Sequence, residues 1–134
     1  MPVLDTSFLI DVERRRDNAI NAYEKLIHGG QPLLIPAQVA TEYLTGLDDE
    51  IAGLHQLELA FAVVPFGRIQ VLEAARLAKL AHRGGEFPGW GDAQVAALAA
   101  IEQTYVVSAD TKHYEAFGVP CWDYRTQDEP PPPG

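Results

Sequence analysis

The sequence has a single cysteine, Cys121. One thiol can form neither an internal disulfide nor a cysteine-based zinc site. No apolar run approaches the roughly 20 residues that are needed to span a bilayer. The N-terminus lacks the basic stretch followed by an apolar stretch that marks a secretory signal. We therefore expect a cytoplasmic protein with no membrane association.

Basic residues are also scarce, because 10 Lys and Arg stand against 19 Asp and Glu, for a net charge of −9. This balance argues against non-specific nucleic-acid binding, which needs clustered Lys and Arg. It does not exclude a metal-dependent nuclease, because acids gathered in one pocket bind divalent cations that reverse the local charge. The dense basic cluster in the sequence is Arg14–Arg16. Its position is equally compatible with phosphate contacts and with a solvated helix end.

The 134 residues are 47% hydrophobic and 22% charged, which is typical of one soluble globular domain. Short apolar runs alternate with helical patterns, so we predict an α/β protein, a three-layer α/β/α sandwich with a mostly parallel central sheet. The predicted strands are residues 2–5, 33–35, 61–64 and 105–107, with an edge strand at 120–122. The predicted helices are residues 6–15, 18–28, 36–46, 48–58, 68–82, 92–102 and 111–117.

Local signals refine these elements. Thr6 or Ser7 can cap the first helix and Asp17 the second. A buried stripe of the helix at 68–82 is predicted at Val71, Ala74, Ala78 and Ala81. We expect residues 1–125 to form the domain. The segment 126–134 contains four consecutive prolines and few apolar groups, so we predict that it is disordered.

Four acids stand at positions where predicted elements meet. Asp5 and Asp110 each follow a strand, and Asp92 stands at the start of an alanine-rich helix. Each of these three has a plain structural reading as a helix cap or turn residue. Because Thr6 or Ser7 can cap the first helix, Asp5 is free for another role. Glu42 borders the inner face of its helix, although a lone helical Glu is usually a solvated surface group.

Together the acids indicate a metal site. The carboxyl ends of parallel strands meet at one edge of a sheet, where ligands bind in open α/β folds. Carboxylates about 4 Å apart repel by roughly 1 to 4 kcal/mol per pair, so a cluster of four needs a cation to offset it. Oxygen ligands without Cys or clustered His favour Mg²⁺ or Mn²⁺. Such a metal lowers the pKa of bound water and polarises a phosphoryl oxygen, which is the chemistry of phosphodiester hydrolysis.

The sequence resembles the PIN-domain ribonucleases, specifically the VapC-type toxins of toxin–antitoxin pairs. The resemblance covers about residues 3–122. It rests on Asp5-Thr6-Ser7-Phe8-Leu9-Ile10-Asp11, on Glu42 in its Val-x-x-Glu helix, on Asp92-Ala93-Gln94-Val95-Ala96-Ala97-Leu98-Ala99, and on Ser108-x-Asp110 with His113 and Phe117 following.

This resemblance implies a PIN-like fold and a site in which Asp5, Glu42, Asp92 and Asp110 bind Mg²⁺ or Mn²⁺. Ser108 takes the supporting hydroxyl position, and Thr6 or Ser7 can assist. It also implies cleavage of single-stranded RNA, homodimerisation and inhibition by a small antitoxin protein, with which the toxin forms a hetero-oligomer. The resemblance also implies that the helices after Asp5 and Glu42 form the antitoxin groove and the dimer contact.

Other functions remain to be distinguished. A catalytically silent PIN-like module that only binds proteins would be expected to lack an acid, and all four are present. A receiver-type signalling domain needs an Asp at the end of a central strand and a late Lys, whereas the third predicted strand ends in Val64–Pro65. A haloacid-dehalogenase phosphatase needs a second Asp two residues after the first, where Ser7 stands.

The loop at residues 83–91 is rich in Gly and contains Phe87 and Trp90. Either aromatic side chain could stack on an RNA base, although such side chains more often fix a loop to the body of the protein. The histidines are scattered along the sequence, and none is assigned to catalysis.

Overall fold

The computed structural model describes residues 1–132, and residues 133–134 lie outside the description. The strands are β1 (Val3–Leu4), β2 (Leu34–Pro36), β3 (Ala62–Val64), β4 (Val106–Val107) and β5 (Cys121–Trp122). The helices are α1 (Thr6–Glu13), α2 (Asp17–His28), α3 (Ala37–Leu44), α4 (Glu50–Ala60), α5 (Arg68–Arg83), α6 (Trp90–Ile101) and α7 (Thr111–Glu115).

The strands form one sheet in the order β3-β2-β1-β4-β5, and every pairing is parallel. The register places Val3 beside both Leu34 and Val106. From β1 the chain proceeds to β2 and β3 on one side, and it then returns to β4 and β5 on the other side. The order therefore reverses between β1 and β4, and the carboxyl ends of these two strands flank the crevice where open α/β sheets bind ligands.

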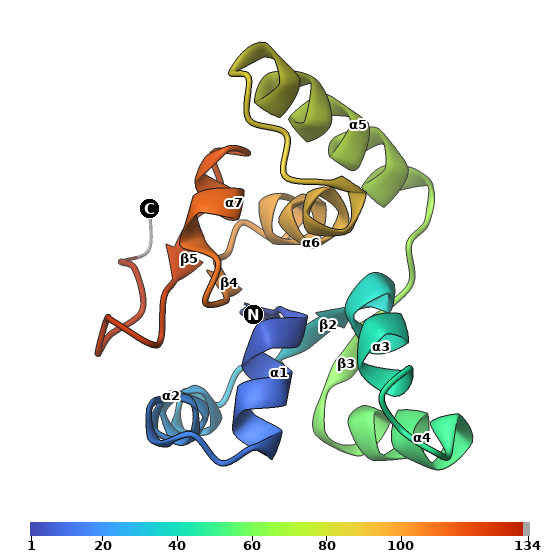
Figure 1. Ribbon diagram of the computed structural model, residues 1–134, viewed down its shortest axis with the longest axis vertical. Coiled ribbons are helices and arrows are strands. Elements are labelled where there is room, and N and C mark those ends of the chain that lie inside the picture. Colours follow the sequence, from blue (N-terminus) through green and yellow to red (C-terminus); the bar gives the residue numbers. More distant parts are fainter. Residues whose placement is uncertain (133–134) are drawn as a thin grey trace.

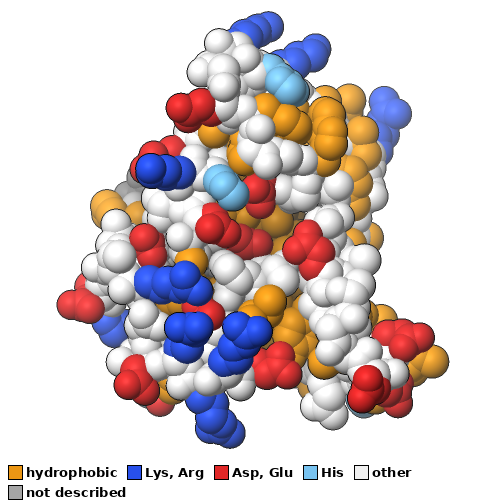
Figure 2. Space-filling view, in the orientation of Figure 1, with side chains coloured by type: hydrophobic (Ala, Val, Ile, Leu, Met, Phe, Trp, Pro, Cys, Tyr) orange, Lys and Arg blue, Asp and Glu red, His pale blue; other side chains and the backbone are white. Residues whose placement is uncertain are grey.

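Helices cover both faces of the sheet, which confirms the predicted α/β/α sandwich. Figure 1 shows α5 and α6 on one side of the strands and α1 and α2 on the other. In the same orientation, acidic side chains gather near the centre of the visible face (Figure 2). Among residues 1–132, the longest helices are too short or too polar to cross a membrane.

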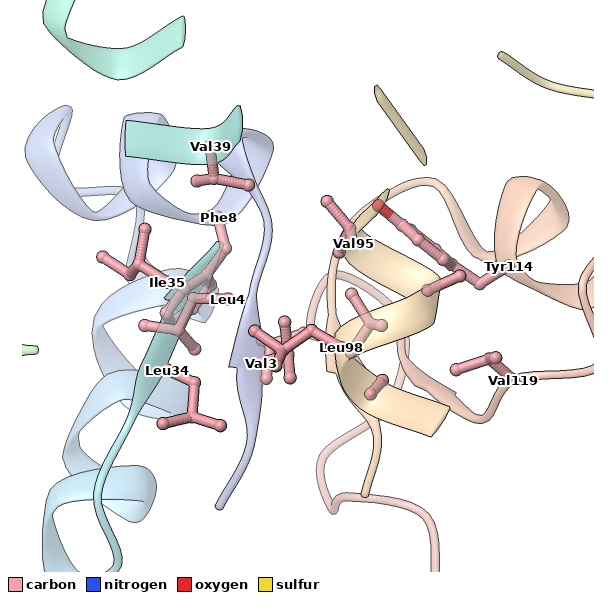
Figure 3. Close-up of a cluster of buried hydrophobic side chains, with 14 of the residues drawn as sticks. Val3, Leu4, Phe8, Leu34, Ile35, Val39, Val95, Leu98, Tyr114 and Val119 are labelled. Carbon is pink, nitrogen blue, oxygen red and sulfur yellow. The ribbon is translucent and has the colours of Figure 1, made fainter. Parts of the chain in front are cut away.

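The core is centred on β1 and α6. Successive residues of a strand point to opposite faces of its sheet, so the two residues of β1 serve both layers. Figure 3 shows Val3 on the side of Leu98 in α6, whereas Leu4 lies beside Ile35 and Phe8. All of these side chains are buried. Most of α6 is buried as well, because its alanines allow a close approach to the sheet and to α5.

Two predicted helix caps are wrong. Thr6 and Ser7 are already helical, and the N-cap of α1 is Asp5, whose Oδ1 accepts a hydrogen bond of 2.7 Å from the backbone N–H of Thr6. The N-cap of α2 is Arg16, so Asp17 is the first residue of the helix and not its cap. Asp5 is therefore not free of a capping role, because its Oδ1 holds the start of α1 and only its Oδ2 remains for other contacts.

The helix α6 begins at Trp90, two residues before the predicted start, so Asp92 lies inside its first turn. In α5 the alanines of the predicted stripe are buried, but Val71 is 49% exposed. The stripe fails at Val71 because the buried residues of α5 begin further along the helix, at Ala74.

The described part of the C-terminal segment lies against α2. The Nζ of Lys25 is 2.9 Å from a carboxylate oxygen of Glu129 and also contacts the carbonyl oxygen of Asp128. The indole N–H of Trp122 donates a hydrogen bond of 3.0 Å to the carbonyl oxygen of Gln127. Residues 126–132 contain neither helix nor strand. The prediction of a disordered tail extends to residues 133 and 134, which lie outside the described residues, and the division at residue 125 stays a prediction.

Candidate functional site

Asp5 lies at the crevice between β1 and β4. Its backbone N–H donates to the carbonyl oxygen of Val107 at 3.1 Å, so the pairing of the two strands continues up to the acid. The side chain is only 7% exposed. Its Oδ2 accepts a hydrogen bond of 2.7 Å from the hydroxyl of Ser108, and its Oδ1 caps α1. Both carboxylate oxygens are therefore held in place from within the protein.

Ser108 joins the two strand ends. Its side chain is fully buried, and besides donating to Asp5 its Oγ accepts a hydrogen bond of 3.0 Å from the backbone N–H of Asp110. The same Oγ lies 3.3 Å from Oγ of Ser7. The hydroxyl thus orients Asp5 and shapes the turn that presents Asp110, whose side chain is exposed.

Asp92 reaches the same place from the first turn of α6. Its Oδ2 lies 2.9 Å from Nδ1 of His113, and its Oδ1 lies 3.5 Å from the phenol oxygen of Tyr114. His113 is half-exposed, whereas Tyr114 is fully buried. Both belong to α7, at the third and fourth positions after Asp110, and at either spacing a helical side chain can lie on the same side as that of Asp110.

These two residues were missed by the reasoning from sequence, which left His113 without a role and did not consider Tyr114. The available signal was their spacing after Asp110. It was too weak to use, because nothing in the sequence shows that α7 packs beside the first turn of α6.

The electrostatics connect three of the acids. Burial raises the pKa of Asp5, hydrogen bonds from Ser108, Thr6 and Tyr114 lower it, and the charge of Asp110 raises it further. The net direction is upward. The pKa of Asp92 is also raised, first by burial and then by repulsion from Asp5, with His113 acting in the opposite direction. Asp5, Asp92 and Asp110 are therefore close enough to repel one another.

Glu42 borders this group from α3. Its side chain is exposed, and its two oxygens accept hydrogen bonds from the hydroxyl of Thr6 at 3.0 Å and from the amide of Gln38 at 2.7 Å. A Cβ added to Gly91 would lie 3.4 Å from Glu42 Oε1. Glu42 is thus placed between the starts of α1 and α6, beside the residue that precedes Asp92.

The donor set fits a hard divalent cation, because it consists of carboxylates that repel one another in a partly buried site. The side chains are not arranged to ligate one as they stand. Within residues 1–132, no group of three or more Asp, Glu, His and Cys side chains could hold a metal ion. Ser108, Gln38 and His113 instead engage the carboxylates of Asp5, Glu42 and Asp92. The assignment of all four acids to a metal site therefore stays a prediction.

The aromatic residues of the loop before α6 differ from each other. Phe87 is half-buried, stacks on His82 with ring centroids 4.2 Å apart, and meets Trp90 edge to face at 4.8 Å. These contacts favour the structural reading of Phe87. Trp90 is 62% exposed, so its indole is available at the surface beside the site.

The model of the family described as PIN domain matches residues 3–118. The crystal structure of FitAcB from Neisseria gonorrhoeae superposes with a TM-score of 0.80 at 21% identity, over 95% of this chain and 100% of that chain.

Two further structures are similar. VapBC2 from Rickettsia felis, bound to a DNA fragment from its promoter, gives a TM-score of 0.70 at 17% identity over 91% of this chain and 98% of that one. VapBC-1 from nontypeable Haemophilus influenzae gives a TM-score of 0.72 at 16% identity, over 93% of this chain and 98% of that one. No curated protein is significantly similar to this chain in sequence. At these sequence identities, the similarity to the solved structures establishes the fold alone.

Proposed function

Because this chain belongs to the PIN-domain family, we propose that it is a Mg²⁺- or Mn²⁺-dependent endoribonuclease and the toxin of a toxin–antitoxin pair. One observation supports the proposal above the others. The ends of β1 and β4 are joined by the hydrogen bonds of Ser108 to Asp5 and to the backbone N–H of Asp110, and Asp92 in the first turn of α6 contacts α7, which follows Asp110. The pKa values of Asp5 and Asp92 are both raised, mainly by burial and in part by neighbouring acids. This arrangement costs stability and is retained in many enzymes because it serves chemistry.

In this proposal Asp5, Asp92 and Asp110 hold the metal, and Glu42 joins them by releasing Gln38 or Thr6. The metal, when bound, activates a water and stabilises the leaving oxygen of a phosphodiester. Ser108 keeps Asp5 in orientation by its short hydrogen bond. His113 is 2.9 Å from Asp92 and orients that carboxylate, while leaving the other oxygen directed toward Tyr114. RNA is the proposed substrate.

The proposed partner is a cognate antitoxin protein. The solved structures with similar folds include FitAB and VapBC complexes, three of which are described as bound to DNA. We propose by analogy that this chain forms a homodimer and a hetero-oligomer with its antitoxin, and that it acts in the cytoplasm.

The proposal is tested by cleavage of a single-stranded RNA with Mn²⁺. Asp92→Asn should reduce the rate at least about 100-fold, because a metal ligand is lost while the side-chain shape is kept. Glu58→Gln, a change of the same kind on the exposed face of α4, should cleave at the parental rate. Addition of Mn²⁺ should raise the melting temperature of the unsubstituted protein but not that of Asp92→Asn. Parental cleavage by Asp92→Asn would refute the site.

A catalytically silent protein-binding module is the second candidate. It is favoured by the contacts of Asp5, Glu42 and Asp92, because each of these carboxylates is engaged by a donor within the protein. Among residues 1–132 they do not form a group that could hold a metal ion. This alternative predicts no Mn²⁺-dependent rise in melting temperature and no cleavage of any RNA. Both results together would replace the nuclease proposal.

A further inference from the structure

A second charged cluster lies on α1 beyond the acidic site. Asp11 is only 2% exposed, yet it is ionisable and lies in the helix interior. Its Oδ1 lies 3.1 Å from Nε of Arg16. Its Oδ2 accepts hydrogen bonds from Nε and Nη2 of Arg125 at 3.0 and 2.7 Å and from the phenol of Tyr124 at 2.6 Å. Burial acts to raise the pKa of Asp11, but these donors lower it overall.

The cluster contains more positive charge than its structural role requires. One guanidinium would neutralise Asp11, and Tyr124 already attaches the C-terminal segment to α1 by its hydrogen bond and by packing edge to face on Phe8 at 4.9 Å. Two arginines leave the cluster with a net charge of +1. The side chains of Arg16 and Arg125 are 56% and 45% exposed, so the remaining N–H donors of both guanidinium groups are accessible.

The cluster is connected to the acidic site. Asp11 stands six residues after Asp5, or about 9 Å along the axis of α1. The phenol oxygen of Tyr124 lies 3.3 Å from the carbonyl oxygen of Ser7, and Oγ of Ser7 lies 3.3 Å from that of Ser108. In Figure 2, basic side chains gather on the same face as the central acidic group and beside it. A strand that is bound at the acids and follows α1 would therefore reach the arginines that contact Asp11.

We propose that Arg16 and Arg125 form a clamp for a backbone phosphate of the RNA strand, and that Asp11 is the positioning residue that holds the two guanidinium groups side by side. The inference rests on the proposed function and specifies how its substrate is held. Guanidinium groups match phosphate oxygens by paired hydrogen bonds, and an overall acidic protein needs such a local site to hold a polyanion.

The test measures binding of a fluorescent single-stranded oligouridine to the full chain with Asp5→Asn, so that the strand is not cut. Arg16→Ala and Arg125→Ala should each weaken binding by roughly tenfold, the equivalent of one good charge-assisted contact. The slope of log K against log salt should become shallower by about 0.7 for each arginine removed. Arg83→Ala is the matched control. It removes an exposed arginine at the far end of α5, opposite α1 in Figure 1, and should leave both quantities unchanged.

Asp11→Asn separates positioning from net charge. Removing a carboxylate makes the protein less negative, so a diffuse electrostatic effect predicts tighter RNA binding, whereas the clamp predicts weaker binding because the guanidinium groups lose their orientation. A melting curve checks that this variant is folded. If it is not, the double replacement of Arg16 and Arg125 by Lys takes its place, because it keeps the charge and removes the planar fork.

The outcomes are distinct. RNA binding by the double alanine variant equal to that of Arg83→Ala overturns the clamp and leaves the nuclease proposal standing. The clamp is also overturned if the alanine variants lose affinity for polyglutamate as much as for oligouridine, because the arginines then recognise the carboxylates of a protein partner. Loss of oligouridine binding in the clamp variants, without RNA cleavage by the unsubstituted protein, supports the clamp and counts against the nuclease. Failure of the Asp5→Asn reference to bind oligouridine overturns the clamp, and the nuclease proposal is then decided by the cleavage assay with Mn²⁺.

Discussion

Replacement of Asp5 by Asn should make the metal-free protein more stable while removing its proposed activity. Asp5 is a buried carboxylate whose charge is disfavoured by burial and by the charge of Asp110. The pKa of Asp92 is raised in part by repulsion from Asp5. A neutral side chain of the same shape relieves both costs. The expected gain in the free energy of unfolding thus comes from the removal of a charge at the site and not from better packing of the core.

The size of the gain follows from two opposing contributions. Two unit charges about 6 Å apart repel by roughly 3 kcal/mol at an effective dielectric constant of about 20, which is an upper bound for this site because Asp110 is exposed and screened by solvent. Against this, the hydrogen bond of 2.7 Å from Ser108 to a charged acceptor is lost, which costs about 1.5–3 kcal/mol. The amide oxygen of Asn can still accept from Thr6 N–H, and the Ser108 hydroxyl can turn to accept from the amide. The net expectation is on the order of 1 kcal/mol of added stability, or about 3–5 °C in melting temperature.

The pH dependence has a definite sign. The folded-state pKa of Asp5 is raised above its ordinary value of 3.8. In the pH interval between 3.8 and the raised pKa, the folded protein therefore binds more protons than the unfolded chain. Stability therefore falls as the pH rises through the interval, and the full penalty is present above it. Asn has no such penalty. The advantage of Asp5→Asn should be largest near neutral pH and should shrink as the pH falls toward 3.8.

The assay is thermal denaturation in EDTA at several pH values, followed by the same scan with Mn²⁺. Asp110→Asn, a change at an exposed acid of the same group, is the control and should stabilise less. With Mn²⁺ the order should reverse, because the unsubstituted protein alone gains from metal binding. A lower melting temperature of Asp5→Asn in EDTA at neutral pH would show that the hydrogen bonds of Asp5 outweigh the repulsion, and the reasoning would be wrong.

Four further outcomes are expected from thermal or chemical denaturation and, where stated, from RNA cleavage. Phe8→Ala should cost about 3–5 kcal/mol, because a fully buried ring is lost. Tyr124→Phe should cost about 1–3 kcal/mol by removing a donor to a buried carboxylate. The pKa of Asp11 is lowered, so its ion pairs stabilise the protein fully above pH 3.8, the ordinary pKa of an Asp, and this stability is lost as the pH falls through the lower folded-state pKa. Asp11→Asn should therefore be less stable than the unsubstituted protein at neutral pH, and this difference should disappear as the pH falls from 3.8 to the folded-state pKa. Gly91→Ala should be stable, because its Cβ would meet its neighbours at 3.4 Å or more, and it should slow RNA cleavage because the methyl group would limit the movement of Glu42 toward the other acids.

The periodicity of the chain predicted the fold correctly in its main features. Alternation of short apolar runs with helical patterns depends on local residue order, and all five strands and seven helices that it predicted are present among residues 1–132. The errors lie at element ends. Thr6 and Ser7 were expected to cap α1, but Asp5 does so, because any of the three polar side chains satisfies the same local rule.

The candidate site was predicted in part. Asp5, Asp92 and Asp110 were expected at one edge of the sheet because strand ends and helix starts alternate there. The structure places Asp5 and the turn of Asp110 on either side of Ser108, and their assignment to a metal site stays a prediction. The exact ligand geometry was not accessible. Rotamers depend on hydrogen-bond donors such as Gln38 and His113, whose positions depend on tertiary packing.

What the amino-acid order alone determined is the set of elements and the presence of an acid after β1 and after β4. What only the tertiary structure decided is which distant residues meet: Ser108 bonds to Asp5 across 103 positions, and Tyr124 bonds to Asp11 across 113. The physical reason is that helix and strand signals arise from neighbours along the chain. Contacts between elements depend instead on strand order and on how the helices pack, which residue spacing does not encode.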